Sequence, residues 1–402
     1  MKYSKEEVLQ YVAEEDVKFI RLAFCDVYGV QKNISVMPHE LKRAFEYGIA
    51  IDASAIEGFE DEVHSDLFLH PDPSTLTVLP WRPEHGRVVR MFCNISYPDG
   101  TPYTNDTRSL LVKAVEEAKS LGYTFYFGAE MEFYLFRLNE YGKPTKEPYD
   151  NAKYMDIAPD DKGENVRREI CLTLEQMGIS PESSHHEEGP GQNEIDFRYS
   201  DALSAADNAV TFKSVVKTVA ARNGLYADFS PKPLENCAGN GLHINMSVRD
   251  KSGKELIDAL IPALLEKTGE ITLFLNPVAD SYKRLGNNKA PAYISWSAQN
   301  RSQLIRIPAA IGEYKRLELR SPDPEANPYL AFTLLIYAGL YGLTKKLPLP
   351  PPADVNFFTL DKAALAEFKR LPSTLEEAKV QAKASAFVQE HLPESLIDAY
   401  CR

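Results

Sequence analysis

The chain has 402 residues, of which 44% are hydrophobic and 26% charged, as in ordinary globular proteins. Because single hydrophobic cores stop growing at roughly 250 to 300 residues, we expect two domains. The formal net charge of −13 argues against nucleic acid or an anionic membrane as a general partner, since the chain has no basic surplus to neutralise phosphates.

Cysteine usage and the first residues predict the compartment. The five cysteines are widely spaced and include no CxxC pair, which favours free thiols in a reducing environment. Residues 1–19 are charged throughout and lack the apolar core of a signal peptide. The most apolar stretch, 328–343, is shorter than the roughly 20 residues that span a bilayer, so we interpret it as a buried helix. We therefore expect a cytoplasmic protein.

The beginning of the chain predicts a small α+β unit with one helix before its strands. Residues 97–107, YPDGTPYTNDT, are rich in turn-forming residues and mark a boundary near residue 100. We therefore expect a domain over 1–100 and a second over 101–402. Within the first, a helix is expected over 4–14 and strands within 17–29, 33–38, 74–80 and 87–97.

The remainder mixes helices with short strands. Asp106 or Thr107 is expected to cap a helix that stops near Gly122. The proline run at 347–354 predicts a connector. Helices are expected over 108–122, 163–178, 207–224, 328–343 and 375–392.

Residues 128–136, GAEMEFYLF, have the alternation of a β-strand and an unusual pair of acids. The period of two places Glu130 and Glu132 on one face and apolar side chains on the other. Burying a charge costs several kcal/mol unless something pairs with it. The strand therefore predicts cations beside these two carboxylates.

Three other stretches show the same anomaly. Alternation groups polar side chains in GLHINMS at 241–247 and in KRLELRSPDP at 315–324, while in HHEEGPGQNEIDF at 185–197 a glycine-broken loop separates Glu187 from Glu194. The polar groups on the two strands are His243, Asn245 and Ser247, and Arg316, Glu318 and Arg320, and the loop acids are Glu187 and Glu194.

The four stretches together provide five carboxylates and one imidazole as candidate metal ligands. Such an oxygen-rich set suits Mg²⁺ or Mn²⁺ better than Zn²⁺, and five acids exceed what one divalent ion requires, so two or three ions are expected. The candidate ligands are Glu130, Glu132, Glu187, Glu194, His243 and Glu318.

Arginines form a second cluster in neighbouring strings. Their planar guanidinium binds phosphate and carboxylate oxygens bidentately, and metals with arginines indicate phosphoryl transfer. The chain has no Walker A motif, so side chains and metals would hold the phosphates. These arginines are Arg284, Arg301, Arg306, Arg316 and Arg320.

Simpler readings of single residues exist. A lone Glu or Arg on a strand is more often a solvated edge or a structural ion pair, and His185 with His186 could be loop residues only. Acids two apart on a strand lie roughly 6 to 7 Å apart and could serve a glycosidase. That chemistry leaves five arginines unused.

The strings GAEMEF, SSHHEEGPGQNEIDF, GNGLHINMS, NPVADSYKRL, NRSQLIRIP and RLELRSPDPEANPYLAF resemble glutamine synthetase, type I, in order and approximate spacing. The resemblance covers about residues 17 to 345. It implies an α+β fold, with a small N-terminal β-grasp-like domain and a catalytic domain built on a curved antiparallel sheet flanked by helices. It also implies a homo-oligomer, commonly two stacked hexameric rings, with shared active sites.

The resemblance also implies roles. Glu132, Glu187 and Glu194 would hold the metal nearer the acceptor carboxylate, and Glu130, His243 and Glu318 the metal on the nucleotide phosphates. Arg301 would contact the phosphoryl group in flight. Asn245, Ser247, Arg306 and Arg316 would bind ATP, and Gly239, Arg284 and Arg320 would hold glutamate.

In the reaction that the family implies, the γ-carboxylate of glutamate attacks ATP and ammonia then displaces phosphate from the γ-glutamyl phosphate. Asp52, in IDASAIEGF, matches the ammonium-site aspartate and would come from the neighbouring subunit. Its charge would favour NH₄⁺ and help to remove a proton.

Several positions depart from the family pattern. Ala55 replaces a hydroxyl residue, Ala238 replaces an asparagine, and Lys289 stands in LGNNKAP where the flap ordinarily ends in glutamate. DVNFF lacks the tyrosine of adenylylated members, so we expect that regulation to be absent. Three functions follow: glutamate–ammonia ligation, ligation of glutamate or another acid to a different amine, and a non-catalytic nucleotide-binding ring protein.

Overall fold

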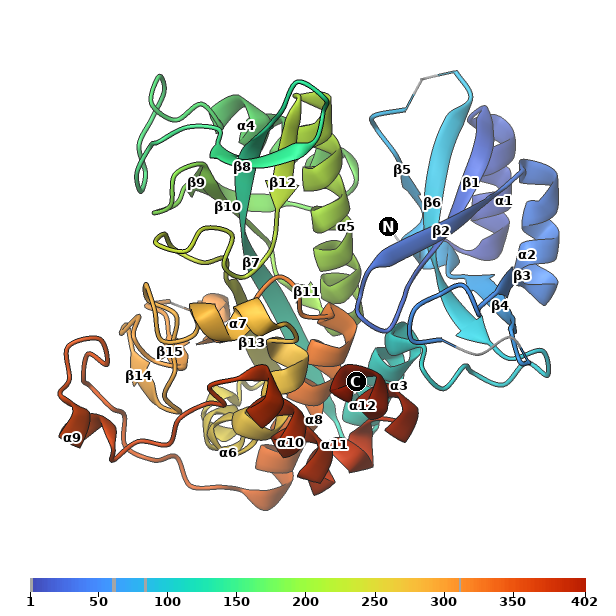
Figure 1. Cartoon of the computed structure of the whole chain (residues 1–402). Coiled ribbons are helices and arrows are strands. Elements are labelled where there is room, and N and C mark those ends of the chain that lie inside the picture. The colour runs from blue at the N-terminus through green and yellow to red at the C-terminus, as the bar shows by residue number, and fades with distance from the viewer. Residues whose placement is uncertain (1–2, 60–62, 83–84, 311) are drawn as a thin grey trace.

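The first β-sheet lies in the N-terminal part of the chain, shown in blue in Figure 1. In the computed structural model of the protein, which describes residues 3–59, 63–82, 85–310 and 312–402, six strands form this sheet in the order β2-β1-β6-β4-β3, with β5 on β6. Only β1 and β6 pair in parallel among these described strands. The elements are α1 (Lys5–Glu14), β1 (Val17–Cys25), β2 (Gln31–Val36), α2 (Leu41–Tyr47), β3 (Ile49–Asp52), β4 (Asp66–Pro71), β5 (Thr77–Val78) and β6 (Arg87–Ser96).

The predicted helix over 4–14 is confirmed as α1. Ser4 caps it: its hydroxyl accepts from the Glu7 amide, and the Glu7 carboxylate accepts from the Ser4 amide at 2.7 Å. The apolar positions Val8 and Val12 are buried in a core of their own beneath the first sheet. The predicted strand over 74–80 is reduced to the two residues of β5.

The second sheet has ten strands in the order β14-β15-β16-β13-β7-β10-β9, and β8, β11 and β12 also pair with β7. The expected antiparallel sheet is confirmed, except that β14 and β15 pair in parallel. Its strands are β7 (Tyr123–Leu138), β8 (Pro144–Pro148), β9 (Pro181–His186), β10 (Gln192–Phe197), β11 (Ser200–Asp201), β12 (Leu225–Asp228), β13 (Leu242–Asp250), β14 (Trp296–Ala298), β15 (Ile305–Ile307) and β16 (Leu317–Leu319).

Helices pack against the second sheet. Asp106 caps α3 as expected, accepting from the Arg108 amide. Two other predictions are wrong in their bounds. α5 begins at Ala202 because Asp201 caps it, and the helix predicted over 375–392 breaks at Ser385, whose hydroxyl caps a separate helix. The helices are α3 (Thr107–Ser120), α4 (Glu164–Gln176), α5 (Ala202–Arg222), α6 (Ile257–Leu275), α7 (Ala279–Arg284), α8 (Pro328–Lys345), α9 (Lys362–Leu365), α10 (Leu375–Ala384), α11 (Ala386–His391) and α12 (Glu394–Cys401).

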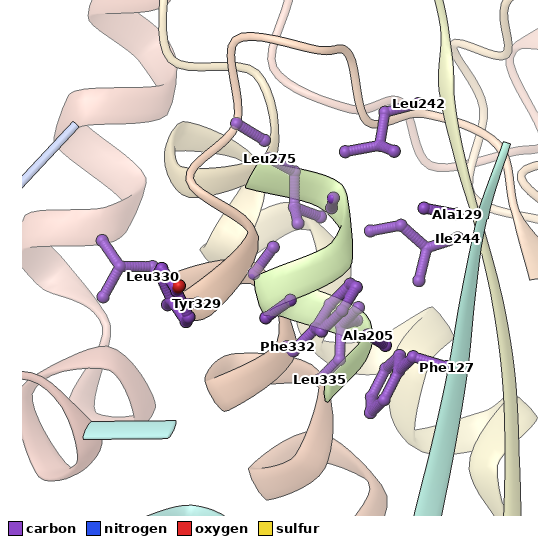
Figure 2. Packing of buried hydrophobic residues seen from close by; sticks show 14 of the residues in the cluster. Phe127, Ala129, Ala205, Leu242, Ile244, Leu275, Tyr329, Leu330, Phe332 and Leu335 are labelled. Atoms are coloured by element: carbon purple, nitrogen blue, oxygen red, sulfur yellow. The ribbon is translucent and has the colours of Figure 1, made fainter. Parts of the chain in front are cut away.

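The core of this larger part lies between the sheet and α8, which is buried as the sequence predicts. Phe127 of β7 stacks on Phe332 of α8 with ring centroids 4.3 Å apart. Figure 2 shows the aliphatic side chains of β7 and β13, among them Ala129 and Ile244, facing the same helices. None of the helices in the described ranges is long and apolar enough to cross a membrane.

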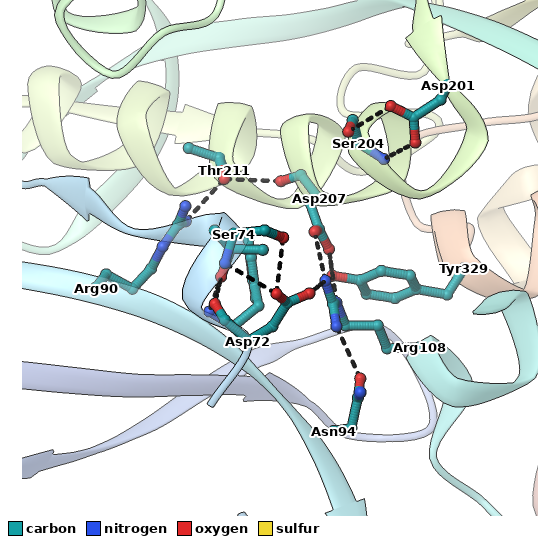
Figure 3. Close-up of polar contacts among 12 residues, drawn as sticks. Asp72, Ser74, Arg90, Asn94, Arg108, Asp201, Ser204, Asp207, Thr211 and Tyr329 are labelled. Atoms are coloured by element: carbon teal, nitrogen blue, oxygen red, sulfur yellow. Dashed lines mark hydrogen bonds and ion pairs between the residues drawn. The ribbon is translucent and has the colours of Figure 1, made fainter. Parts of the chain in front are cut away.

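A buried polar network joins the two sheets. Arg108 of α3 donates to Asp207 of α5 at 2.9 and 3.0 Å, to Asp72 after β4 at 2.9 Å and to Asn94 of β6 at 2.7 Å (Figure 3). The hydroxyl of Tyr329 donates to Asp207 at 2.7 Å. Arg108 is 3% exposed, so its charge depends on these carboxylates. The network therefore fixes the first sheet relative to the second.

Candidate active site

The polar face of the second sheet lines a cavity of about 610 Å³. It adjoins a cavity of about 260 Å³ with which it shares Glu130, Ser183, Asp196 and Arg316. Asn245 and Ser247 line the smaller cavity. The larger cavity contains most of the residues expected from the sequence, namely Glu130, Glu132, Glu187, Glu194, Gly239, His243, Arg284, Arg301, Arg306, Arg316 and Arg320.

Two expected residues line neither cavity. Glu318 is 1% exposed and lies behind Arg306 and Arg320, to both of which it is ion-paired. Asp52 is exposed at the end of β3 in the first sheet, where its carboxylate accepts from the Ser54 hydroxyl at 2.6 Å. Within one chain, Asp52 is therefore separate from the other candidates.

Strand register brings the acids together. Glu130 of β7 lies opposite His243 of β13, and Glu132 lies opposite Glu194 of β10. The alternate residues Ala129 and Met131 are 1% exposed on the core side, which confirms the predicted alternation. Four candidate ligands on three adjacent strands thus face the same cavity.

Glu130 and His243 form one end of the ligand set. Nδ1 of His243 lies 3.5 Å from Glu130 Oε2 and 3.6 Å from Glu318 Oε1. Although burial opposes it, hydrogen bonding to His243 and to the Asn245 amide lowers the pKa of Glu130 to about 2. Glu130 is therefore a carboxylate throughout the physiological range.

Glu132 and Glu194 form the more crowded end. Burial raises the pKa of Glu132, although the Gly241 amide donates to it at 2.6 Å. Burial and the neighbouring carboxylates, Glu132 first, raise the pKa of Glu194 well above its usual value. Like charges packed this closely ionise together only beside a cation. The site has the electrostatics that a bound metal requires.

Ligand atoms also meet at metal-binding spacing. One atom each from Glu130, Glu194 and His243 lie within 4.8 Å of one another, and the same holds for His185, Glu187 and Glu194. Carboxylate oxygens dominate both groups, a donor set that suits hard divalent cations. The residues present therefore fit the expected Mg²⁺ or Mn²⁺.

The two adjacent histidines are not loop residues, so that reading of the sequence is wrong. His185 is in β9 and lines the cavity, and hydrogen bonding to Glu187 raises its pKa. His186 is fully buried on the other face, with its ring nitrogens 2.9 Å from the Asp150 carboxylate and 2.7 Å from the Glu187 carbonyl. The same period-2 alternation, applied to SSHHEE, would have found His185.

The arginines line the same cavity as the acids. Arg284 donates to the backbone carbonyls of Ser321 at 2.7 Å and Arg320 at 3.2 Å, so it also fixes the chain after β16. Nε of Arg316 donates to Asn245 at 2.7 Å. A cavity lined by both carboxylates and guanidinium groups is suited to anionic substrates bound with cations.

Of the three residues that depart from the family pattern, two line this cavity and one does not. Lys289 and Ala238 line it, whereas Ala55 lies exposed after β3, near Asp52 in the chain. The Ala238 carbonyl accepts from the Tyr134 hydroxyl at 2.6 Å. Asp196, which sequence reasoning missed, also lines the cavity, because it occupies the same face of β10 as Glu194.

Comparisons with known proteins agree with this geometry. The model of the glutamine synthetase β-Grasp domain matches residues 16–98, and that of the glutamine synthetase catalytic domain matches residues 104–402. A glutamine synthetase of Methanosarcina mazei is 46% identical over 99% of this chain and 92% of its own. One of Clostridium saccharobutylicum is 42% identical over 99% of this chain and 94% of its own.

A solved structure gives the same result for the fold. The chain of a GmaS/ADP complex superposes with a TM-score of 0.88 at 28% identity, covering 98% of this chain and 93% of that chain. Since both domain models match in order and curated relatives align over nearly the full length, the chain belongs to the glutamine synthetase family of ATP-dependent ligases.

Proposed function

We propose that this chain joins ammonia to the γ-carboxylate of glutamate at the expense of ATP, through a γ-glutamyl phosphate, and so forms glutamine. The observation that carries the proposal is the single cavity in which a buried carboxylate–imidazole cluster faces several arginines. Relatives at 41 to 46% identity that are named glutamine synthetase favour ammonia over a different amine.

The acids would hold divalent cations, Mg²⁺ or Mn²⁺, two or three per site. Glu132, Glu187 and Glu194 would hold the cation nearer the acceptor carboxylate, and Glu130, His243 and Glu318 the cation on the nucleotide phosphates. In support, Glu130 lines both the larger and the smaller cavity. Both oxygens of Glu318 already accept hydrogen bonds from arginines, so Glu318 would bind a cation through its remaining lone pairs. When bound, the cations would neutralise the phosphate and carboxylate oxygens that converge there.

The chain's other residues would bind and orient the substrates. Asn245, Ser247, Arg306 and Arg316 would hold ATP beside the smaller cavity, and Arg301 would stabilise charge on the phosphoryl group as it moves. Arg284, Arg320 and the backbone at Gly239 would hold glutamate. Arg284 suits this role because burial and two backbone carbonyls fix its guanidinium.

Asp52 would take part from the neighbouring subunit. It is exposed, charged and remote from its own chain's cavity, as a residue donated across a subunit boundary would be. We propose a homo-oligomer of two stacked hexameric rings with shared sites, cytoplasmic, with domains over 1–100 and 101–402. The two family matches, which end at 98 and begin at 104, and five unpaired cysteines support these assignments.

Phosphate release from ATP and Mg²⁺ tests the function. With glutamate present, we expect release that depends on ammonium, and Glu194→Gln should abolish it. Phosphate release that depends only on a primary amine or a polyamine would show that this amine, and not ammonia, is the substrate joined to glutamate. Nucleotide binding without turnover under any amine would indicate a non-catalytic ring protein.

A further inference from the structure

The flap after α7 is a tight turn that ends beside the cavity. The Gly286 amide donates to the Ala290 carbonyl at 3.0 Å, and the Ala290 amide donates to the Asn287 carbonyl at 2.9 Å. Asn288 and Lys289 have φ of 45° and 66°, in the left-handed region that a lysine rarely adopts. The backbone therefore holds Lys289 in a defined position at the lining of the cavity.

The partner of Lys289 lies on the opposite loop. Nζ of Lys289 forms an ion pair with Glu188 Oε1, and it lies 5.8 Å from the ring centroid of Tyr154. Glu188 follows β9, and its amide donates to the Glu187 carboxylate at 2.9 Å. All four side chains line the same cavity. The contact thus joins the loop of a candidate metal ligand to the loop that follows Arg284.

The ion pair between Lys289 and Glu188 is partly exposed to water. The side chains of Lys289 and Glu188 are 53% and 35% exposed, so water and salt screen their attraction. Such a pair contributes little to stability, whereas the buried pairs of Glu318 do not leave their places without a large penalty. An exposed pair between two loops at a cavity wall has the properties of a reversible closure.

We propose that Glu188 and Lys289 form a latch over the carboxylate end of the cavity, and that this specificity-determining pair admits ammonia but hinders larger amines. The proposal rests on the proposed function. In the proposed function the amine attacks a carboxylate held beside Glu187 and Arg284, and the ion pair joins the loops that carry these two residues. On this proposal an alkyl group on the attacking nitrogen would meet the closed pair, whereas ammonia would not. Paired with Glu188, the lysine is also neutralised, so it no longer repels ammonium from the site.

Charge exchange tests the latch. We expect Lys289→Ala and Glu188→Ala each to lower the preference for ammonium over methylamine, measured as a ratio of kcat/KM, by about tenfold. The double variant Glu188→Lys with Lys289→Glu should restore most of that preference. Lys283→Ala, which removes a lysine paired with Asp280 outside the cavity, is the matched control and should not change the ratio.

Hydrogen exchange provides a readout that does not depend on turnover. The amides of Gly286 and Ala290, which are bonded within the flap, and of Asn287, which donates to the Arg284 carbonyl at the end of α7, should exchange faster in either single variant and at high salt. The exchanged pair should restore their protection. The latch would be overturned if both single variants kept the amide protection and the ammonium preference of the wild type. It would also be overturned if the charge-exchanged double variant restored neither quantity relative to the single variants.

The two hypotheses fail in different ways. Wild-type protein without ammonium-dependent phosphate release would overturn the proposed function and, with it, ammonia as the amine that the latch selects. Wild-type protein that uses ammonium, with single variants of unchanged preference, would overturn only the latch.

Discussion

At the scale of single residues, Glu318 has the most constrained carboxylate of the site. It is 1% exposed and ion-paired with both Arg306 and Arg320, and the imidazole of His243 lies 3.6 Å away. Its charge compensates two guanidinium groups that would otherwise stand uncompensated at the cavity wall. Glu318 therefore has a structural role that is independent of any metal.

Replacing Glu318 with Gln should lower the free energy of unfolding by about 3 to 5 kcal/mol, because it leaves two largely buried arginines without a counter-charge. Denaturant unfolding measures this. The control is Glu376→Gln, which removes an ion pair between the exposed Glu376 carboxylate and Lys379 and should change the free energy of unfolding by less than about 1 kcal/mol. Equal effects of the two substitutions would contradict the structural role.

Glu194 and Glu130 should differ in proton release when a divalent cation binds. The raised pKa of Glu194 means that metal-free protein still holds its proton above the usual carboxyl range, whereas Glu130, with a pKa of about 2, has already lost its own. Mg²⁺ binding should therefore release a proton and tighten as pH rises. Calorimetric titration in buffers of different ionisation enthalpy measures the release.

Glu194→Gln should reduce this proton release more than Glu130→Gln, which removes only one of the carboxylates that raise the pKa of Glu194. The raised pKa of Glu194 also makes the stability of the protein depend on pH. The folded metal-free protein keeps a proton on Glu194 that the unfolded chain loses near the ordinary carboxyl pKa. The free energy of unfolding of the metal-free protein should therefore fall as pH rises from that ordinary pKa toward the raised one. Metal binding without proton release would contradict both expectations.

At the scale of elements, alternation on β7 and β13 was sufficient to predict which side chains face the cavity, because the period of a strand does not depend on its neighbours. Helix bounds depended on caps: Asp201 extended α5, and Ser385 divided a predicted helix. The contacts of Lys289 could not be predicted, since they depend on where two loops meet.

The contact between β7 and α8 supports the cavity from beneath. Phe332→Ala should remove the ring that stacks on Phe127 and cost about 3 to 5 kcal/mol of stability. Phe358, which is 43% exposed, is the matched control, and its replacement with Ala should have a much smaller effect. Thermal unfolding compares them, and KM values measured well below the transition should remain near those of the wild type.

At the scale of the whole molecule, the described chain brings candidate metal ligands and arginines to one cavity, whereas Asp52 does not line that cavity. The sequence could predict the acids and arginines because they lie on strands with a regular period. It could not show within one chain how Asp52 reaches a cavity. The shared site that we propose would account for its exposed position.

Mixed oligomers test this sharing. Asp52→Asn and Glu194→Gln should each abolish glutamine formation, and co-refolding the two inactive variants should restore partial activity, because some sites would combine two intact contributions. Each variant refolded alone is the control. If the mixture stays inactive although mixed oligomers form, Asp52 does not act across a subunit boundary.

The Arg108 network limits which chimaeras can be made between this chain and a relative. The charge of Arg108 is compensated partly by Asp72, which follows a strand of the first sheet, and partly by Asp207, from a helix on the second sheet. A fragment that began after residue 100 would lose one of these carboxylates and the Asn94 acceptor. The two domains therefore cannot be exchanged independently. A chimaera of this chain with a relative would have to contain Asp72, Asn94, Arg108 and Asp207 together.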